Sequence, residues 1–266
     1  MDLSFKGAAK RLDDIDLPKL GRRLGVGEDE IHAVMDVESR GTGFDGAGRP
    51  RILFERHIFY RYLPTDKRSE AVKAGLASTK PGGYGKEGDQ YFKLARAMKI
   101  DRRAALFACS WGLMQVMGFN HEAAGYRTVE SMVEAFMQDE EYHLEAAVNF
   151  ILANKLDDEL RRHDWAGFAK GYNGSNYRIN KYDERLAAAF AKWKKIRDTP
   201  WTSGEKDVPA APAKPASAPK PVPAPQAPAK PSPAPVPPPA GKAGTIAFVV
   251  VAAIAAFLSW LFGVAP

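Results

Sequence analysis

The sequence predicts a mainly α-helical domain of the α+β class, followed by a disordered Pro-rich linker and a single transmembrane helix. Apolar residues recur at helical spacing through most of residues 1–200, with one short strand-like run. Residues 208–241 consist almost only of Pro, Ala, Lys, Val and Ser, a composition that cannot form a core. Residues 244–265 carry no charge. We therefore expect a globular domain over 1–200, a linker over 201–243 and an apolar helix over 244–266.

The composition excludes several classes of partner and site. The chain has 266 residues and a formal net charge of +6, which suits an anionic polymer or a membrane surface. No run of Lys and Arg resembles a nucleic-acid footprint, so we expect no nucleic-acid partner. Cys109 is the only cysteine, so an intrachain disulfide cannot form. The N-terminus has no apolar run, and no signal peptide is expected.

Three helices are expected at the start of the domain. Short helical patterns run over 5–12 and 17–24, the second with Pro18 near its start. Gly27 precedes three acidic residues, which suit the first turn of a third helix because the positive end of the helix dipole lies there. The pattern of this third helix ends at Glu38.

Glu38 therefore stands at the C-terminal end of a helix. Ile31, Val34 and Val37 form the apolar side of that helix, and Gly41 helps to stop it. A carboxylate in this place meets the negative end of the helix dipole, and apolar surroundings would further favour its protonated form. Such an acid can protonate a departing sugar oxygen. The alternative is a solvated glutamate that only ends a helix.

The rest of the domain is expected to alternate helices with glycine-rich loops. A strand-like run over 51–55 puts Glu55 across a cleft from Glu38. Residues 81–85 are expected to form a loop, and 110–120 have no regular pattern. Helices are expected over 57–62, 90–98, 102–109, 129–152, 165–172 and 182–196. The five histidines lack metal-ligand spacing, so we expect neither a metal site nor a cofactor.

Three short motifs follow one another along the domain. They are Val37-Glu38-Ser39-Arg40-Gly41, Trp111-Gly112-Leu113-Met114-Gln115-Val116 and Lys170-Gly171-Tyr172-Asn173-Gly174. This order resembles the lysozyme superfamily, in particular goose-type lysozymes and soluble lytic transglycosylases. The segment 44–62, with Leu53-Phe54-Glu55-Arg56-His57, is similar to the N-acetylmuramidase family found in endolysins of phages that infect Gram-negative bacteria. The resemblance covers residues 5–198 and implies a lysozyme-like fold.

The resemblance implies a peptidoglycan hydrolase that cleaves the β-1,4 bond between N-acetylmuramic acid and N-acetylglucosamine for host cell lysis. Glu38 matches the general acid of the family, and Glu55 is the expected second catalytic carboxylate. Amides can bind sugar hydroxyls and acetamido groups, and aromatic faces can cover pyranose rings. The substrate site is accordingly expected to contain Gln115, Tyr172, Asn173 and Trp111.

Each of these assignments has a simpler alternative. Trp111 can be a core residue, Gln115 can satisfy only loop amides, and Asn173 can be a helix cap. Glu55 can form a salt bridge to one of three arginines, Arg51, Arg56 or Arg61. For the whole protein, the alternatives are a lytic transglycosylase, which uses no second carboxylate, and a catalytically silent peptidoglycan-binding protein.

The C-terminal segments predict a tethered domain. The linker should be an extended, semi-rigid spacer with a reach on the order of 100 Å. Residues 246–264 would span roughly 28 Å as a helix, close to the apolar thickness of a bilayer, and Trp260 suits an interfacial position. We therefore expect a monomeric enzyme that is held at the inner membrane by its C-terminal helix and acts on periplasmic peptidoglycan. The alternative is a membrane-active tail that never spans the bilayer.

Overall fold

The computed structural model of the chain describes residues 3–39, 41–174, 177–200 and 202. Apart from Thr202, the expected linker and the expected transmembrane helix lie outside these residues and stay predictions. Among the described residues, no helix is both long enough and apolar enough to cross a membrane.

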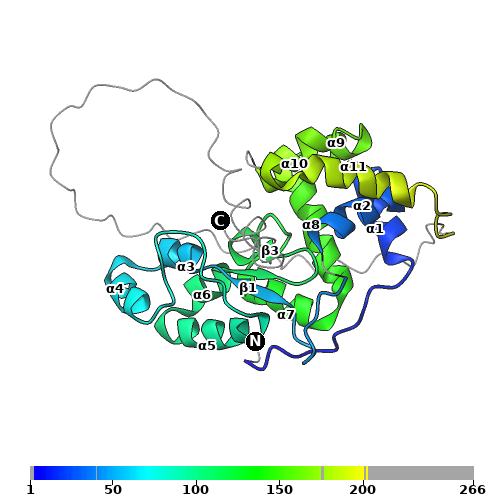
Figure 1. The fold of residues 1–266 in the computed structure, drawn as a ribbon. Helices are drawn as coiled ribbons and strands as arrows, with labels where there is room; N and C mark the ends of the chain where they lie inside the picture. The colour runs from blue at the N-terminus through cyan, green and yellow to red at the C-terminus, as the bar shows by residue number, and fades with distance from the viewer. Residues whose placement is uncertain (1–2, 40, 175–176, 201, 203–266) are drawn as a thin grey trace, which may run out of the picture. The chain divides into compact units, whose positions relative to one another are not determined.

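The described domain is mainly helical and contains one small antiparallel sheet, which confirms this part of the predicted fold class (Figure 1). The α-helices are α1 (Asp16–Leu24), α2 (Glu28–Glu38), α3 (Arg56–Tyr62), α4 (Thr65–Lys73), α5 (Gln90–Ile100), α6 (Arg102–Phe107), α7 (Val129–Gln138), α8 (Glu140–Ala153), α9 (Asp157–Arg161), α10 (Trp165–Asn173) and α11 (Tyr182–Trp193). The strands are β1 (Ile52–Phe54), β2 (Cys109–Trp111) and β3 (Val116–Met117), and the short 3-10 helices are η1 (Glu87–Asp89), η2 (Gly118–Asn120) and η3 (Tyr177–Asn180).

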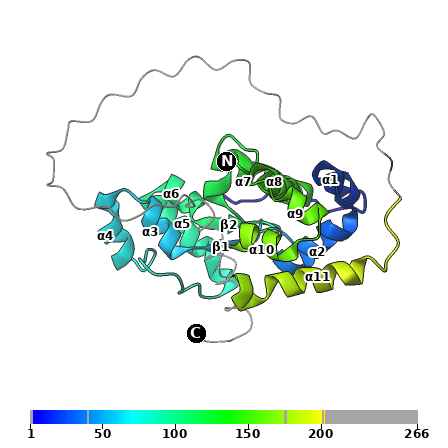
Figure 2. The ribbon, with the colours of Figure 1, turned by 90° about the horizontal axis from the view of Figure 1, so that it is seen from above.

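Helix α2 carries Glu38 and is held from two sides. Its apolar residues Ile31, Val34 and Val37 are all buried, as the helical pattern predicted. Its most extensive helix contact is with α11, and α1 packs against it as well. Figures 1 and 2 show α2 and α11 side by side, although more than a hundred residues separate them in the sequence. The C-terminal end of α2 is therefore enclosed by a distant segment of the chain.

The predicted helix over residues 5–12 is wrong, whereas the second N-terminal helix is confirmed as α1. Phe5 and Ala9 have φ angles of 54° and 49°, which a right-handed helix cannot contain. The backbone of this segment bonds to the end of α7 instead: Ala9 N donates to Met137 O at 3.1 Å, and Lys10 N to Gln138 O at 2.9 Å. These distant partners outweigh the weak local helical pattern.

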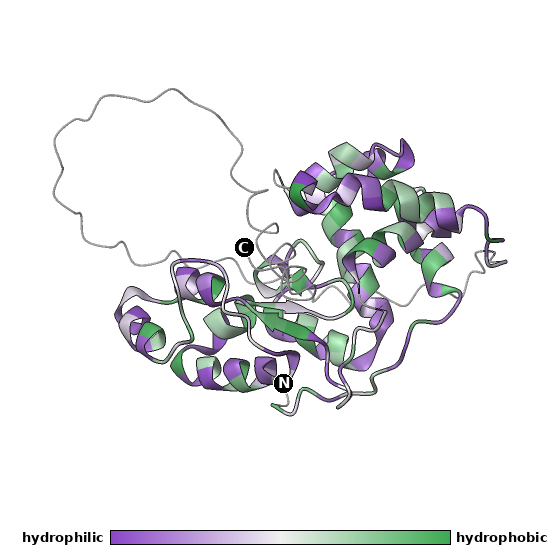
Figure 3. Cartoon of the chain, viewed as in Figure 1, coloured by the Kyte–Doolittle hydropathy of each residue, from purple (hydrophilic) through white to green (hydrophobic). Residues whose placement is uncertain are grey.

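The segment 110–120, expected to lack regular structure, contains most of a β-hairpin. Strand β2 lies in the middle of the sheet, with Leu53 of β1 opposite Ser110 and Ser110 opposite Met117 of β3. The helix predicted over 102–109 ends early, at Phe107, because Cys109 joins this sheet. Strands of two or three residues are too short to show an alternating pattern. Strand β1, in contrast, was predicted correctly, and its apolar residues are plain in Figure 3.

The long helix predicted over 129–152 is two helices, α7 and α8, that meet at Asp139. Asp139 has extended backbone angles, with φ −153° and ψ 140°, and its side chain accepts a hydrogen bond from Glu141 N at 2.9 Å. Asp is a favoured N-cap residue, so it begins a new helix here. Glu140 N donates to Lys10 O at 2.9 Å, which ties the break to the N-terminal segment. The apolar pattern runs on across the break, and for that reason the sequence pattern did not reveal it.

Candidate active site

The centre of the candidate site is Glu38, the last residue of α2. Its side chain is only 6% exposed. Asn173, the last residue of α10, donates from Nδ2 to Glu38 Oε1 at 2.9 Å. Glu38 Oε2 is buried and has no hydrogen-bond partner among the described residues. One oxygen of the carboxyl group is thus held in place, and the other is left for a further partner.

The surroundings of Glu38 favour its protonated form. Loss of contact with water raises the pKa of Glu38 from its ordinary value of 4.5 to about 7. The hydrogen bond from Asn173 and the positive charge of Arg185 act in the opposite direction and limit this rise. Arg185 lies on α11, and its Nη2 donates to Val37 O at 3.1 Å. A carboxyl group in this setting can still carry a proton near neutral pH.

Helix α10 delivers both Tyr172 and Asn173 to this place, as the motif predicted. Gly174 ends the helix with a φ of 81°, a backbone angle that suits glycine. Asn173 is buried, and its contact with Glu38 means that it does more than end α10. Tyr172 is also buried, with its ring stacked on Phe168 at a centroid distance of 5.3 Å. Most of the Tyr172 ring is therefore packed into the core.

Gln115 uses both ends of its amide inside the β2–β3 hairpin. Its Oε1 accepts from Ser110 Oγ at 2.8 Å, and its Nε2 donates to Gly112 O at 2.7 Å. Its backbone has a positive φ of 50°, which is uncommon for a residue with a side chain. The hydrogen bonds agree with the simpler alternative, in which Gln115 satisfies loop groups. Gln115 nevertheless borders a small surface pocket, whose lining is Met114, Gln115, Val116, Met117, Asn120, Phe150 and Tyr172.

Trp111 was expected to bind sugar, but the structure places it in the core. Its side chain has no exposed surface. Its Nε1 donates to Leu106 O at 3.1 Å, and its ring packs against that of Phe5 at a centroid distance of 5.8 Å. An indole that is fully enclosed by protein cannot cover a pyranose ring. The expectation for Trp111 is corrected accordingly.

Glu55, directly after β1, is fully buried. His57 Nδ1 lies 3.1 Å from Glu55 Oε2, and the Tyr84 hydroxyl is also nearby, but neither contact has the alignment of a hydrogen bond. Burial raises the pKa of Glu55, and the contacts with His57 and Tyr84 oppose the rise. The neighbour of Glu55 is therefore a histidine rather than one of the three arginines. A buried carboxylate with poorly satisfied oxygens is more typical of a functional site than of a structural ion pair.

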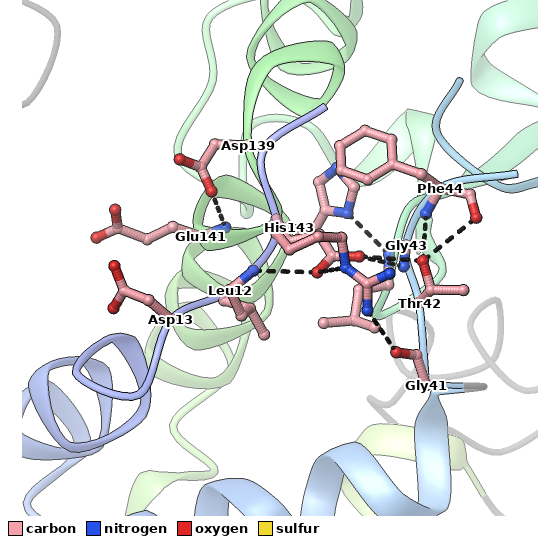
Figure 4. A network of polar contacts seen from close by, with 12 residues as sticks. Leu12, Asp13, Gly41, Thr42, Gly43, Phe44, Asp139, Glu141 and His143 are labelled. Carbon is pink, nitrogen blue, oxygen red and sulfur yellow. Dashed lines mark hydrogen bonds and ion pairs between the residues drawn. The ribbon is translucent and has the colours of Figure 1, made fainter. Parts of the chain in front are cut away.

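A buried network around Glu140 fixes the loop that follows Glu38, and the sequence analysis did not identify it. Glu140 is 1% exposed and accepts hydrogen bonds from Arg11 Nε at 2.7 Å, Leu12 N at 3.1 Å and Gly43 N at 2.6 Å. Arg11 also donates to Gly41 O at 2.9 Å. Figure 4 shows the loop from Gly41 to Phe44 beside Leu12 of the N-terminal segment and His143 of α8.

His143, one turn after Glu140, extends this network to the hairpin. Burial lowers the pKa of His143 to about 4, so the ring is neutral at pH 7. Its Nδ1 accepts from Leu113 N at 3.0 Å, and its Nε2 donates to Phe136 O at 2.7 Å. A Cβ atom at either Gly43 or Gly112 would clash with this ring. The first turn of α8 thus holds the loop after Glu38 and the hairpin that carries Gln115. In the sequence, only the two glycines indicated such close packing.

A second cavity, of about 230 Å³, lies beside this network and contains none of the predicted site residues. Its lining is Arg11, Leu12, Asp13, Asp14, Leu17, His32, Met35, Gly41, Leu113, Glu140 and Thr199. Its side chains include no unpartnered buried group, so the chemistry points to Glu38 instead. In the described part of the chain, no group of three His, Cys, Asp or Glu residues could hold a metal ion.

Comparison with known proteins agrees with this geometry. The family model for muramidase, described as N-acetylmuramidase, matches residues 28–194. The crystal structure of the Burkholderia AP3 phage endolysin is similar to this chain, with a TM-score of 0.65 and 42% sequence identity over 70% of this chain and 73% of that one. No curated protein matches the chain. The family predicted from the motifs is confirmed, and the chain belongs to the N-acetylmuramidase family.

Proposed function

We propose that this glycoside hydrolase cleaves the β-1,4 bond between N-acetylmuramic acid and N-acetylglucosamine, as an endolysin that lyses the host cell. Membership of the N-acetylmuramidase family and the similarity to a phage endolysin support peptidoglycan as the substrate. The observation that carries the proposal is the state of Glu38. It is a buried carboxyl group with a pKa of about 7, one oxygen held by Asn173 and the other without a protein partner.

In this proposal Glu38 is the general acid. The proton resides on Oε2, the oxygen that Asn173 does not hold, and passes to the glycosidic oxygen as the bond from that oxygen to the sugar C1 breaks. A water molecule then supplies the new oxygen on C1 and loses a proton, and Glu38 ends the cycle protonated. Asn173 keeps the carboxyl group in one orientation throughout. Activity should therefore fall as the pH rises through the pKa of Glu38, since the ionised form cannot donate.

The other predicted residues act less directly than Glu38 in the proposal. Tyr172 and Gln115 border the pocket beside Asn173, and Gln115 keeps the hairpin in its shape. Glu55 is the second carboxylate. Since it has no exposed surface, we assign it an electrostatic effect on positive charge at the sugar ring rather than contact with the attacking water.

The direct test combines one variant with one product analysis. Glu38→Gln keeps the acceptor that Asn173 needs but has no ionisable proton, so it should lower turnover by on the order of 10² to 10⁴ without loss of the fold. Glu122→Gln, an exposed glutamate, is the matched control and should retain full activity. Near-normal turnover in the Glu38→Gln protein would refute the assignment.

The reaction type is tested by mass spectrometry of digested peptidoglycan. Hydrolysis gives reducing N-acetylmuramic acid ends. A lytic transglycosylase, in which the muramic 6-hydroxyl attacks within the substrate, gives 1,6-anhydro ends instead. A product set dominated by anhydro ends would replace hydrolysis with transglycosylation on the same fold.

The location of the enzyme is a further part of the proposal. We propose that residues 244–266 anchor a monomeric protein to the inner membrane, and that the linker lets the catalytic domain reach periplasmic peptidoglycan. The support is the uncharged run of residues 244–265, which is as long as a bilayer is thick when helical, and the extended character of the Pro-rich segment before it.

A further inference from the structure

Two aromatic side chains from distant segments form a stacked pair at the protein surface. Tyr62 ends α3, and Phe119 lies in η2, directly after β3. Their ring centroids are 5.6 Å apart and their planes differ by 22°. Phe107, the last residue of α6, meets the Tyr62 ring edge-on at 5.2 Å. Because three elements fix these rings, little side-chain freedom remains to be lost when a ligand covers them.

The pair is accessible, unlike the aromatic residues first expected to bind sugar. Tyr62 is 39% exposed and Phe119 is partly exposed, whereas Trp111 and Tyr172 are buried. Among the exposed large apolar side chains of the described residues, one other is aromatic, Phe92, at 65%.

Phe92 differs from Tyr62 in its setting. It projects from α5, and Arg96 lies 5.6 Å from the centre of its ring. In the described part of the chain it has no aromatic partner, and it does not border the pocket of Gln115 and Tyr172. It is an exposed ring of similar size outside the site, and so it offers a matched control.

The stacked pair is linked to the candidate active site through a neighbouring residue of the chain. Asn120, next to Phe119, lines the pocket that also contains Gln115 and Tyr172. Tyr172 in turn precedes Asn173, which holds Glu38. The carboxyl group of Glu38 is therefore connected to the exposed rings through Asn173 and the residues that line the pocket.

The chemistry of this run fits a sugar. A pyranose ring has a flat face of C–H groups and a rim of hydroxyl and acetamido groups. An aromatic ring can cover the C–H face, and the amide of a neighbouring Asn can donate hydrogen bonds to the hydroxyl and acetamido groups and accept hydrogen bonds from them. We propose that Tyr62 and Phe119 form a sugar-binding subsite for a pyranose ring of the peptidoglycan strand, next to Asn120 and away from the cleaved bond. The inference rests on the proposed muramidase function.

A binding experiment tests the subsite separately from catalysis. The protein is the full-length chain with the substitution Glu38→Gln, so that it binds without turnover. The ligands are peptide-free glycan fragments of peptidoglycan, a tetrasaccharide and an octasaccharide, titrated by isothermal calorimetry. Tyr62→Ala should weaken binding of the octasaccharide by about tenfold, the upper range for one aromatic contact, and should affect the tetrasaccharide less. Tyr62→Phe should bind normally, because the ring face rather than the hydroxyl is used.

Phe92→Ala is the control and should bind both fragments as the parent does. Phe119→Leu keeps an apolar side chain of similar size without the flat ring, and it should reproduce the loss if Tyr62→Ala fails to fold. Normal octasaccharide affinity in the Tyr62→Ala and Phe119→Leu proteins, or an equal loss in Phe92→Ala, overturns the subsite. Failure of the parent Glu38→Gln protein to bind either fragment counts against the muramidase function itself.

Discussion

At the scale of single residues, the protonation of Glu38 links activity to stability. Its pKa rises from 4.5 to about 7 in the fold, so the folded state binds the proton more tightly than the unfolded state. The stability that this gives is fully present below pH 4.5 and is lost as the pH rises through 7. The full difference corresponds to about 3 kcal/mol.

Glu38→Gln removes this pH dependence, because the amide does not ionise. We expect the free energy of unfolding of the variant minus that of the parent to be about 2.5 kcal/mol larger at pH 8 than at pH 5, because the parent loses its proton-linked stability over this range and the variant does not. Denaturant titrations of both proteins at the two pH values measure the difference. A pH-independent difference would mean that Glu38 ionises normally and is not the buried acid described above.

Glu55 gives a second prediction at this scale. If its charge supports the reaction, Glu55→Gln should lower kcat by on the order of 10- to 100-fold and leave KM unchanged, since the side chain has no exposed surface with which to bind a sugar. Glu87→Gln is the control, because Glu87 is a half-exposed partner of Arg51. Unchanged kcat in the Glu55→Gln protein would reduce Glu55 to a packing residue beside His57.

The motifs predicted the centre of the site but not its supports. Glu38 and Asn173 are 135 residues apart in the sequence, yet family motifs named both, and their hydrogen bond is present. Arg11, Glu140 and His143 were missed, because a buried polar contact between distant segments leaves no local pattern. Trp111 was misassigned for a related reason: its place in a motif does not say on which side of the hairpin its ring lies.

At the scale of elements, α8 connects the parts of the site. Glu140 is a fully buried charge with Arg11 and two backbone N–H groups as donors. In Glu140→Gln, an NH₂ group replaces one of the two carboxylate oxygens. This NH₂ group cannot accept the hydrogen bonds that Arg11 or the backbone N–H groups donate to the oxygen that it replaces. We expect the free energy of unfolding to fall by about 3 kcal/mol, the range for a broken buried ion pair, and kcat to fall because the loop after Glu38 is released.

Glu141→Gln is the matched control for this prediction. Glu141 is the next residue on α8 and pairs with Lys19 at 2.8 Å without facing the loop. Its loss should cost less than that of Glu140, because Glu141 is less buried and accepts no hydrogen bond from the loop, and it should leave kcat unchanged. Equal effects of the two substitutions in chemical unfolding and in turnover would show that Glu140 has no special relation to the loop.

The helical pattern located several elements correctly and failed at others, and its length did not decide the outcome. The apolar periodicity predicted α2, α5, α10 and α11, with ends shifted by a few residues at most. The pattern failed where contacts between distant segments determine the local structure. Residues 5–12 form hydrogen bonds with the end of α7 instead of a helix. Asp139 divides the segment 129–152, whose continuous apolar stripe suggests a single helix, into two helices. Strands β2 and β3 depend on pairing with β1 and with each other, which no local window contains.

At the scale of the whole molecule, the family match over 28–194 leaves out a segment that the site uses. Arg11 lies before the matched region and still binds the loop after Glu38 through Gly41 O. The described fold therefore includes contacts from residues before 28, and the predicted extent of the resemblance over 5–198 stays a prediction.

The tail provides the last prediction. A Pro-rich spacer before an uncharged helical run is useful where a domain must stay near a membrane and still reach beyond it, and a reach on the order of 100 Å suffices to bridge to the wall. An apolar helix of this length partitions into a bilayer, while the charged surface of a globular domain does not. Full-length protein should sediment with inner membranes, and truncation after Gly241 should release it while activity on purified peptidoglycan is kept, because every proposed site residue lies before residue 200. Recovery of the full-length chain in the supernatant without detergent would exclude the anchor and leave disruption of a membrane by the tail as the account to test.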